Sequence, residues 1–149
     1  MEKIFKHVLV ATDGSLLADR AIALALQLGG DTRVTALMVM HDYGLPEYVR
    51  AALGHRLDAV EIRDQIRAEG QRQLEAALKR AVQGDERIER RVVISELPPS
   101  REIVATAGRE GCDLIVMSSH GLGGPMAGLL GSQAQAVLMT AKVPVLVAR

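Results

Sequence analysis

Short apolar runs rich in valine and isoleucine alternate along this chain with longer segments in which apolar residues recur at helical spacing. The runs lack polar alternation, so each is expected to form a strand that is covered on both faces. A repeat of strand and helix is typical of a parallel β-sheet flanked by helices. Because 48% of the 149 residues are hydrophobic, the chain can build a core of this kind. The apolar runs are residues 7–12, 34–40, 91–95, 113–117 and 143–148.

We predict one α/β domain over residues 1–149, with a doubly wound, five-stranded parallel sheet and helices on both of its faces. The last apolar run contains Pro144. Proline has no N–H to donate to a neighbouring strand, so this strand is expected at an edge of the sheet. An edge strand is also available to pair with a second copy of the chain.

Polar and glycine residues mark the ends of the helical segments. Ser15 is suited to cap the helix that follows the first strand, and Gly29 and Gly30 are suited to end it. Ser100 is expected to cap the helix that follows the third strand. The helical segments are residues 16–28, residues 46–82 with a division at Gly54, residues 101–107 and residues 132–140.

Charge and composition exclude several classes of function. The chain has 18 basic and 18 acidic side chains and a formal net charge of zero, which is unlike a general binder of nucleic acid or anionic membranes. One Phe, two Tyr and no Trp are too few for a platform on which nucleic-acid bases stack. No apolar run approaches the ~18 residues of a membrane span. We therefore expect neither a nucleic-acid partner nor a membrane partner.

Cysteine and histidine usage bears on location and on metal binding. Cys112 is the single cysteine, which fits a reducing compartment, and the first residues lack the apolar stretch of a signal peptide. A cytoplasmic location is therefore expected. Nothing basic adjoins Cys112 in the sequence, so we interpret it as inert packing beside the fourth strand. His7, His41, His55 and His120 lack the spacing of metal ligands, so a metal bound by protein side chains alone is not expected.

Two segments that follow strands differ from ordinary connections. They are residues 11–15, after the first strand, and the glycine-rich residues 118–132, after the fourth. In a doubly wound sheet these strands are neighbours, and ligands bind at carboxyl ends where the winding reverses. The carboxylate of Asp13 could accept hydrogen bonds from ligand hydroxyl or amino groups, although Asp-Gly is equally typical of a simple turn. Gly131 and Ser132 would present amide groups at a helix N-terminus, which favours a phosphate, while the loop glycines serve close approach or flexibility alone.

Motifs of catalysis are absent from the sequence. Gly123 and Gly128 have the spacing of a phosphate-binding loop, but Leu129 and Leu130 stand where its lysine and hydroxyl residue would follow. Neither a dinucleotide-binding glycine triplet nor the G-x-S-x-G of hydrolases occurs. No nucleophile beside a base can be identified, so the sequence favours binding over catalysis.

Several of these segments together resemble the universal stress protein family. They are V-L-V-A-T-D-G-S at residues 8–15, D-L-I-V-M-S-S-H-G at 113–121, G-S at 131–132 and V-P-V-L-V at 143–147. The resemblance covers essentially the whole chain in the same order. It implies a sheet with strand order 3-2-1-4-5, homodimerisation through the last strand and, in one subclass, ATP bound in the crevice described above.

Carried over by position, the resemblance also implies a set of nucleotide-binding residues. Asp13 would contact the adenosine side of the nucleotide, and the backbone of Val39 would contact the adenine. The loop after the fourth strand would line the ribose and phosphates, and the hydroxyl of Ser132 would contact magnesium. The full set is Ala11, Thr12, Asp13, Val39, Met117, Ser118, His120, Gly121, Gly131, Ser132 and Gln133.

Two departures from the family's pattern, G-x2-G-x9-G-[ST], bear on the phosphate end of this site. The first glycine is replaced by Ser118, which matters only if the position requires a positive φ, and a serine hydroxyl can itself bond a phosphate. No Lys or Arg occurs between Arg109 and Lys142. A bound triphosphate would therefore depend on amides, the helix terminus, magnesium, and Arg20 or Arg101 from elsewhere. Weaker binding, or a preference for fewer phosphates, is the expected consequence.

The resemblance and the residues together predict a homodimeric regulatory module of the stress response that binds an adenine nucleotide, with ATP and magnesium as its ligands. One alternative is a dimeric interaction scaffold that has lost nucleotide binding. Another is a slow ATPase, since we expect at most weak ATP hydrolysis from a site without an identifiable base. An unidentified protein partner is a further candidate. The sequence leaves open whether the nucleotide is ATP, AMP or cyclic AMP.

Overall fold

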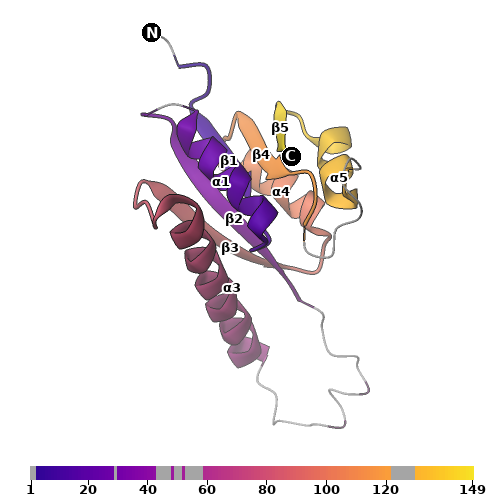
Figure 1. The fold of residues 1–149 in the computed structure, drawn as a ribbon. Helices are drawn as coiled ribbons and strands as arrows, with labels where there is room; N and C mark the ends of the chain where they lie inside the picture. Colours follow the sequence, from indigo (N-terminus) through magenta and orange to yellow (C-terminus); the bar gives the residue numbers. More distant parts are fainter. Residues whose placement is uncertain (1–2, 29, 43–47, 49–51, 53–58, 122–129) are drawn as a thin grey trace.

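The computed structural model describes residues 3–28, 30–42, 48, 52, 59–121 and 130–149. All pairs of neighbouring strands are parallel, and the strand order is β3-β2-β1-β4-β5, as expected for the doubly wound fold (Figure 1). The strands are β1 (His7–Ala11), β2 (Arg33–His41), β3 (Ile88–Ser95), β4 (Leu114–Ser118) and β5 (Val145–Ala148). The helices are α1 (Leu16–Gln27), α3 (Ala59–Val82), α4 (Pro99–Arg109) and α5 (Ser132–Thr140).

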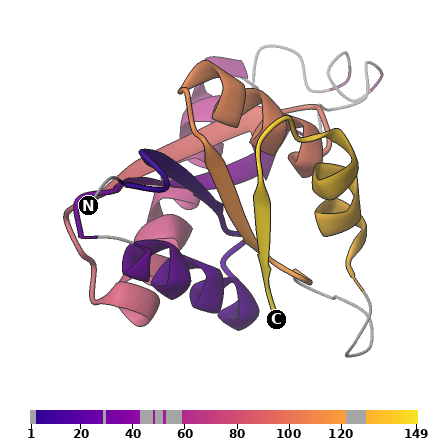
Figure 2. The ribbon, with the colours of Figure 1, turned by 90° about the horizontal axis from the view of Figure 1, so that it is seen from above.

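Helices cover both faces of the sheet, as Figures 1 and 2 show. Val8 and Val10 of β1 pack in one core cluster with residues of α1 and α3. Leu9 and Ala11 belong to the opposite cluster, with residues of α4 and α5. All residues of β1 are buried, which explains why its sequence is an unbroken apolar run. No helix in the described ranges is long and apolar enough to cross a membrane.

The helix ends confirm one expected cap and correct another. The hydroxyl of Ser15 accepts a hydrogen bond from the amide of Ala18 at 3.2 Å, so Ser15 caps α1 as predicted. The expectation that Ser100 caps the next helix is wrong. α4 begins at Pro99 with Pro98 as its N-cap, and Ser100 lies inside its first turn. The amide of Ser100 donates instead to the side-chain oxygen of Gln133 on α5, at 2.8 Å.

The strand boundaries differ from the expected ones at both edges of the sheet. β3 begins at Ile88, three residues earlier than predicted, because its charged residues are paired: Glu89 binds Arg33 of β2, and Arg90 binds Glu75 of α3. β5 begins at Val145, and the carbonyl of Pro144 accepts from Ile115 at 3.0 Å. β5 lies at an edge, as predicted from its proline.

Other expectations concern the crossover and the cysteine. α3 confirms the helical pattern as far as Val82, whereas the predicted division at Gly54 and the helix end at Gly29 lie outside the described residues. Cys112 is buried beside β4 and packs in the cluster with α4 and α5. Burial raises the pKa of its thiol to about 11, which is the expected behaviour of an inert packing residue.

Candidate functional site

The turn after β1 ends the strand with a set of short-range hydrogen bonds. The amide of Thr12 still pairs with the carbonyl of Leu37 on β2 at 2.9 Å. The amide of Gly14 then donates to the hydroxyl of Thr12 at 3.1 Å, and the amide of Ser15 donates to Oδ1 of Asp13 at 3.0 Å. Gly14 has φ +84°, a left-handed conformation that favours glycine. Asp13 is therefore a turn residue, as one of the two sequence interpretations held.

This turn leaves part of β2 without its neighbour. The register pairs Ala11 with Leu37 and stops there. Val39 is two residues further along β2, so its backbone N–H and C=O point to the same side as those of Leu37. If β1 continued straight, Gly14 would donate toward Val39, but it donates to Thr12 instead. The backbone of Val39 thus lies beyond the last residue of β1 that pairs with β2, at the position where the adenine contact was expected.

The turn after β4 meets the turn after β1. A β-carbon placed on Gly121 would collide with Oδ2 of Asp13 and lie 3.3 Å from its Cγ. The two turns are therefore in contact at the point where the winding of the sheet reverses, between β1 and β4. The sequence predicted a ligand crevice at this position, and the absence of a side chain at Gly121 makes room for the Asp13 carboxylate. Asp13 is a ligand candidate as well as a turn residue.

The start of α5 lies against the same turn. The amide of Gly131 donates to the carbonyl of Ser119 at 2.7 Å, and a β-carbon on Gly131 would lie 3.1 Å from that oxygen. The Gly131 amide thus closes the loop, rather than facing a ligand as expected. α5 begins at Ser132, as predicted, and neither a side-chain cap nor an acidic residue occupies its first turn. The exposed Ser132 remains at the helix N-terminus, where an anion is favoured.

Three further residues of the expected site, Ser118, His120 and Gln133, form side-chain hydrogen bonds with other groups of the protein. The hydroxyl of Ser118 donates to the carbonyl of His120 at 2.6 Å. Among the described non-glycine residues only Gln83 has a positive φ, so the position of Ser118 does not require glycine. Nδ1 of His120 lies 3.0 Å from the hydroxyl of Ser119, and its buried Nε2 has no hydrogen-bond partner. The side chain of Gln133 reaches α4. Ala11, Thr12 and Met117 are buried.

An arginine that the sequence did not point to holds the turn after β1. Nη2 of Arg80, on α3, donates to the carbonyl of Gly14 at 2.9 Å, while its Nε donates to Oδ2 of Asp19 on α1 at 2.9 Å. No sequence pattern relates Arg80 to Gly14, since 66 residues separate them. Of the two arginines considered for a triphosphate, Arg20 donates to the backbone carbonyl of Arg149 at 3.0 Å, and Arg101 is exposed on α4.

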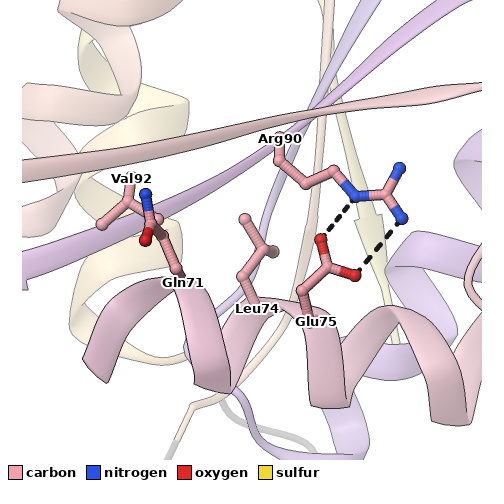
Figure 3. Close-up of a pocket in the computed structure, with 5 residues that line it drawn as sticks. All are labelled: Gln71, Leu74, Glu75, Arg90 and Val92. Carbon is pink, nitrogen blue, oxygen red and sulfur yellow. Dashed lines mark hydrogen bonds and ion pairs between the residues drawn. The ribbon is translucent and has the colours of Figure 1, made fainter. Parts of the chain in front are cut away.

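A small cavity of about 80 Å³ lies away from this crevice, between α3 and β3 (Figure 3). The side chain of Arg90 on its wall is fully engaged: Nε donates to Glu75 at 2.7 Å, and Nη1 donates to the carbonyl of Asp85 at 3.1 Å. This arrangement ties α3 to β3 and leaves the guanidinium no free donor for a ligand. The cavity is lined by Gln71, Leu74, Glu75, Arg90 and Val92.

Comparison with known proteins agrees with this architecture. The universal stress protein of Thermus aquaticus from the QAH/OAS sulfhydrylase 3′ region is 34% identical over 152 residues, which cover 98% of this chain and 100% of that protein. The structure of hypothetical protein MJ0577 has a TM-score of 0.75 at 26% identity and covers 97% of this chain and 96% of its own. A universal stress protein in complex with cAMP has a TM-score of 0.56 at 25% identity, with 97% of each chain covered.

The sequence profile of the universal stress protein family matches residues 4–149. That range contains every strand of the sheet and both turns that meet at Asp13 and Gly121. The match therefore extends over both turns as well as over the core, and the chain belongs to the universal stress protein family.

Proposed function

We propose that this chain binds an adenine nucleotide in the crevice between the turns after β1 and β4, and that it serves as a homodimeric regulatory module of the stress response. The observation that carries the proposal is the contact between Asp13 and Gly121. It brings a carboxylate, which can accept hydrogen bonds from ribose hydroxyls, against a backbone with no side chain. The backbone of Val39 lies beyond the last residue of β1 that pairs with β2, and backbone groups of this kind can hydrogen-bond an adenine edge.

The phosphate end of the proposed site consists of backbone and hydroxyl groups. Ser132 stands at the uncapped start of α5, where the helix dipole and the first amides favour negative charge. When ATP is bound, magnesium would neutralise part of the triphosphate charge, and the Ser132 hydroxyl is the residue we assign to it. No basic side chain lies between Arg109 and Lys142. A nucleotide with fewer phosphates carries less negative charge, so it depends less than ATP does on positive groups at this site.

A structural relative supports the class of ligand. The universal stress protein solved in complex with cAMP covers 97% of this chain. Cyclic AMP carries one phosphate, and the described part of our site offers its phosphate no cationic side chain. We therefore rank adenosine monophosphates with ATP as candidate ligands, and distinguish them by experiment.

The test is a thermal unfolding series of the purified protein with magnesium-ATP, AMP and cyclic AMP. A ligand present at about 100 times its Kd adds ~2.7 kcal/mol to the free energy of unfolding, which raises Tm by several degrees in a domain of this size. A shift with ATP alone assigns the site to a polyphosphate. A shift with AMP or cyclic AMP alone keeps the adenosine half of the proposal and removes the triphosphate.

The variant Asp13→Ala tests whether the ligand-induced change in Tm arises from binding beside Asp13. We expect this variant to lose most of the ligand-induced change in Tm, because it removes the carboxylate at the centre of the crevice. Asp64→Ala is the matched control, since Asp64 is exposed on α3 and distant in sequence from both turns. Equal shifts in wild type and Asp13→Ala would place the nucleotide elsewhere on the protein.

A second candidate, a dimeric scaffold without a nucleotide, is favoured by a specific observation. The Gly131 amide, the Ser118 hydroxyl and the Gln133 side chain all bond other groups of the protein. These groups were expected at the phosphates, and each would be unavailable to a ligand in this arrangement. Protein that carries no copurified nucleotide and shows no shift with any of the three ligands would favour the scaffold.

A further inference from the structure

We propose that Arg80 of α3 is a positioning residue for nucleotide binding, which holds the turn after β1 so that Asp13 presents its carboxylate to the ligand. This inference rests on the proposed function, because it assigns Arg80 a role at the same site. The side chain of Arg80 contacts the backbone of the turn. We propose no direct contact between Arg80 and the nucleotide.

The guanidinium of Arg80 joins separate parts of the chain. Its Nε and Nη2 atoms lie 2.9 Å and 3.2 Å from the two carboxylate oxygens of Asp19, in the first turn of α1. The same Nη2 donates to the carbonyl oxygen of Gly14 at 2.9 Å. One planar group therefore fixes α3 to α1 and to the turn between β1 and α1. A planar fork with several donors in fixed geometry suits this task, whereas a lysine presents a single ammonium group.

Asp19 orients the arginine. The Asp19 side chain is 14% exposed and the Arg80 side chain 39% exposed, so the carboxylate is the more fixed member of the pair. A bidentate pair with one shielded partner has a defined geometry, unlike a pair of two freely exposed side chains. Hydrogen bonding to Asp19 leaves Nη2 directed at the carbonyl of Gly14.

Gly14 is the residue whose backbone sets the direction of Asp13. It has φ +84°. Its amide donates to the hydroxyl of Thr12, its carbonyl accepts from Arg80, and the Ser15 amide of the following peptide donates to Asp13. The Asp13 carboxylate is held at Oδ1 by the Ser15 amide, and its Oδ2 faces Gly121. Releasing the Gly14 carbonyl would let this peptide rotate, and the Ser15 amide that orients Oδ1 would move with it. Arg80 thereby acts on the ligand through Asp13.

The test compares nucleotide affinity in Arg80→Met with that of wild type by isothermal titration calorimetry, well below the Tm of both proteins. Methionine keeps the unbranched stem and removes every donor. We expect about tenfold weaker binding of AMP or ATP, the size of losing one hydrogen bond from a charged donor. Arg87→Met is the matched control, because Arg87 pairs with Asp85 on the surface and makes no contact with this turn. We expect the control to bind as wild type.

A double-mutant cycle separates positioning from a general loss of stability. If Arg80 acts through Asp13, Arg80→Met changes affinity in the wild-type background and has almost no further effect in Asp13→Ala. A purely structural role lowers Tm without changing the affinity of the folded protein, and that result would overturn the proposal. Arg80→Lys should recover part of the affinity, since the lysine ammonium keeps the positive charge and can donate to one of the two partners of Arg80.

Amide hydrogen exchange of the protein without nucleotide gives a readout that does not depend on binding. We expect the amides of Gly14 and Ser15 to exchange faster in Arg80→Met than in wild type and Arg87→Met. Wild-type protein that binds no nucleotide overturns the proposed function, and the exchange rates then still decide whether Arg80 holds the turn. Unchanged exchange and unchanged affinity in Arg80→Met together would remove Arg80 from the site.

Discussion

The contact of Asp13 with Gly121 shows how the absence of one side chain lets two turns approach each other. The carboxylate occupies the space that a β-carbon of residue 121 would need. Gly121 therefore serves close approach, and the interpretation of the loop glycines as flexible spacers does not account for this position. Gly121 does not have a positive φ, so its backbone conformation does not require glycine. The position requires glycine because a larger residue would meet the Asp13 carboxylate.

Gly121→Ala tests this steric argument. We expect the added methyl group to push the Asp13 carboxylate out of place and to weaken nucleotide binding by about tenfold or more, the cost of a lost charge-assisted hydrogen bond. The free energy of unfolding should change by less than about 1 kcal/mol, because the position is exposed. Calorimetric titration and urea unfolding measure the two effects separately. Gly30→Ala is the control, since a β-carbon there meets nothing within 4 Å; equal affinities in the two variants would contradict the steric role.

Cys112 gives a prediction about pH at the residue scale. Burial raises the pKa of its thiol to about 11 in the folded protein, whereas the unfolded thiol titrates near 8.5. Between these values the unfolded chain has lost the proton and the folded chain keeps it, so rising pH favours unfolding. We expect the free energy of unfolding to fall by up to about 1.4 kcal/mol per pH unit between roughly pH 9 and 11. Urea unfolding at pH 8, 9.5 and 11 measures the slope.

Cys112→Ala provides the reference for that measurement. Other groups titrate in the same range, and the variant keeps all of them while it removes the thiol. The difference in the free energy of unfolding between wild type and Cys112→Ala should therefore shrink as the pH rises above about 9, because the contribution of the protonated thiol is lost. A constant difference from pH 8 to 11 would show that the thiol ionises in the folded protein as it does in the unfolded chain.

At the scale of elements, a side chain of α5 accepts a hydrogen bond from a backbone amide in the first turn of α4. An α-helix leaves its first amides without partners inside the helix, and a proline N-cap has no side-chain acceptor for them. The Gln133 side chain on α5 supplies that acceptor to the buried Ser100. The sequence pattern assigned the cap to Ser100 because a hydroxyl residue stood at the start of an apolar stripe. A cap from another helix has no signature in the local sequence.

Gln133→Ala should therefore destabilise the fold. We expect a loss of about 1–2 kcal/mol in the free energy of unfolding, the usual cost of removing a helix cap and leaving a buried amide unpaired. Gln135→Ala is the control, because the Gln135 side chain is exposed and bonds only the carbonyl of Leu130 nearby. Chemical denaturation of both variants measures the difference. If Gln133→Ala keeps its stability and loses nucleotide affinity instead, Gln133 is a phosphate contact, as the family resemblance implies.

At the scale of the whole molecule, the sequence predicted the features that depend on local pattern. Unbroken apolar runs indicated strands covered on both faces, and Pro144 indicated the edge position of β5. The strand order came from the family resemblance. The contacts of Arg80 with Gly14 and of Gln133 with Ser100 could not be predicted, because each joins residues distant in the chain. The early start of β3 was missed for a related reason, since its charges are matched by Arg33 and Glu75 on other elements.

In the described part of the chain β3 and β5 are the edge strands of the sheet, and the proposed homodimer uses the edge formed by β5. The carbonyl of Pro144 accepts a hydrogen bond from Ile115 of β4, and the carbonyl of Ala148 accepts one from Ser119, the residue after β4. Backbone groups alternate in direction along a strand, so the N–H groups of Val145 and Val147 face away from the sheet. Two copies of β5 related by a two-fold axis can pair through these groups. At the opposite edge, the carbonyl of Ser95 in β3 faces β2 and accepts from Asp42. The N–H group of the preceding residue, Ile94, therefore faces away from the sheet.

Val147→Pro removes one outward donor from β5 and leaves the groups that bond β4 in place. In a two-fold dimer the loss occurs twice, so we expect the dimer to dissociate at least about tenfold more readily. Analytical ultracentrifugation over a concentration series checks this against wild-type protein, which should sediment at twice the 16.0 kDa of one chain. Ile94→Pro makes the same change on β3 and should leave the dimer intact. Equal dissociation of both variants would reflect loss of folding rather than of the interface, and a dimer that tolerates Val147→Pro must form through a surface other than β5.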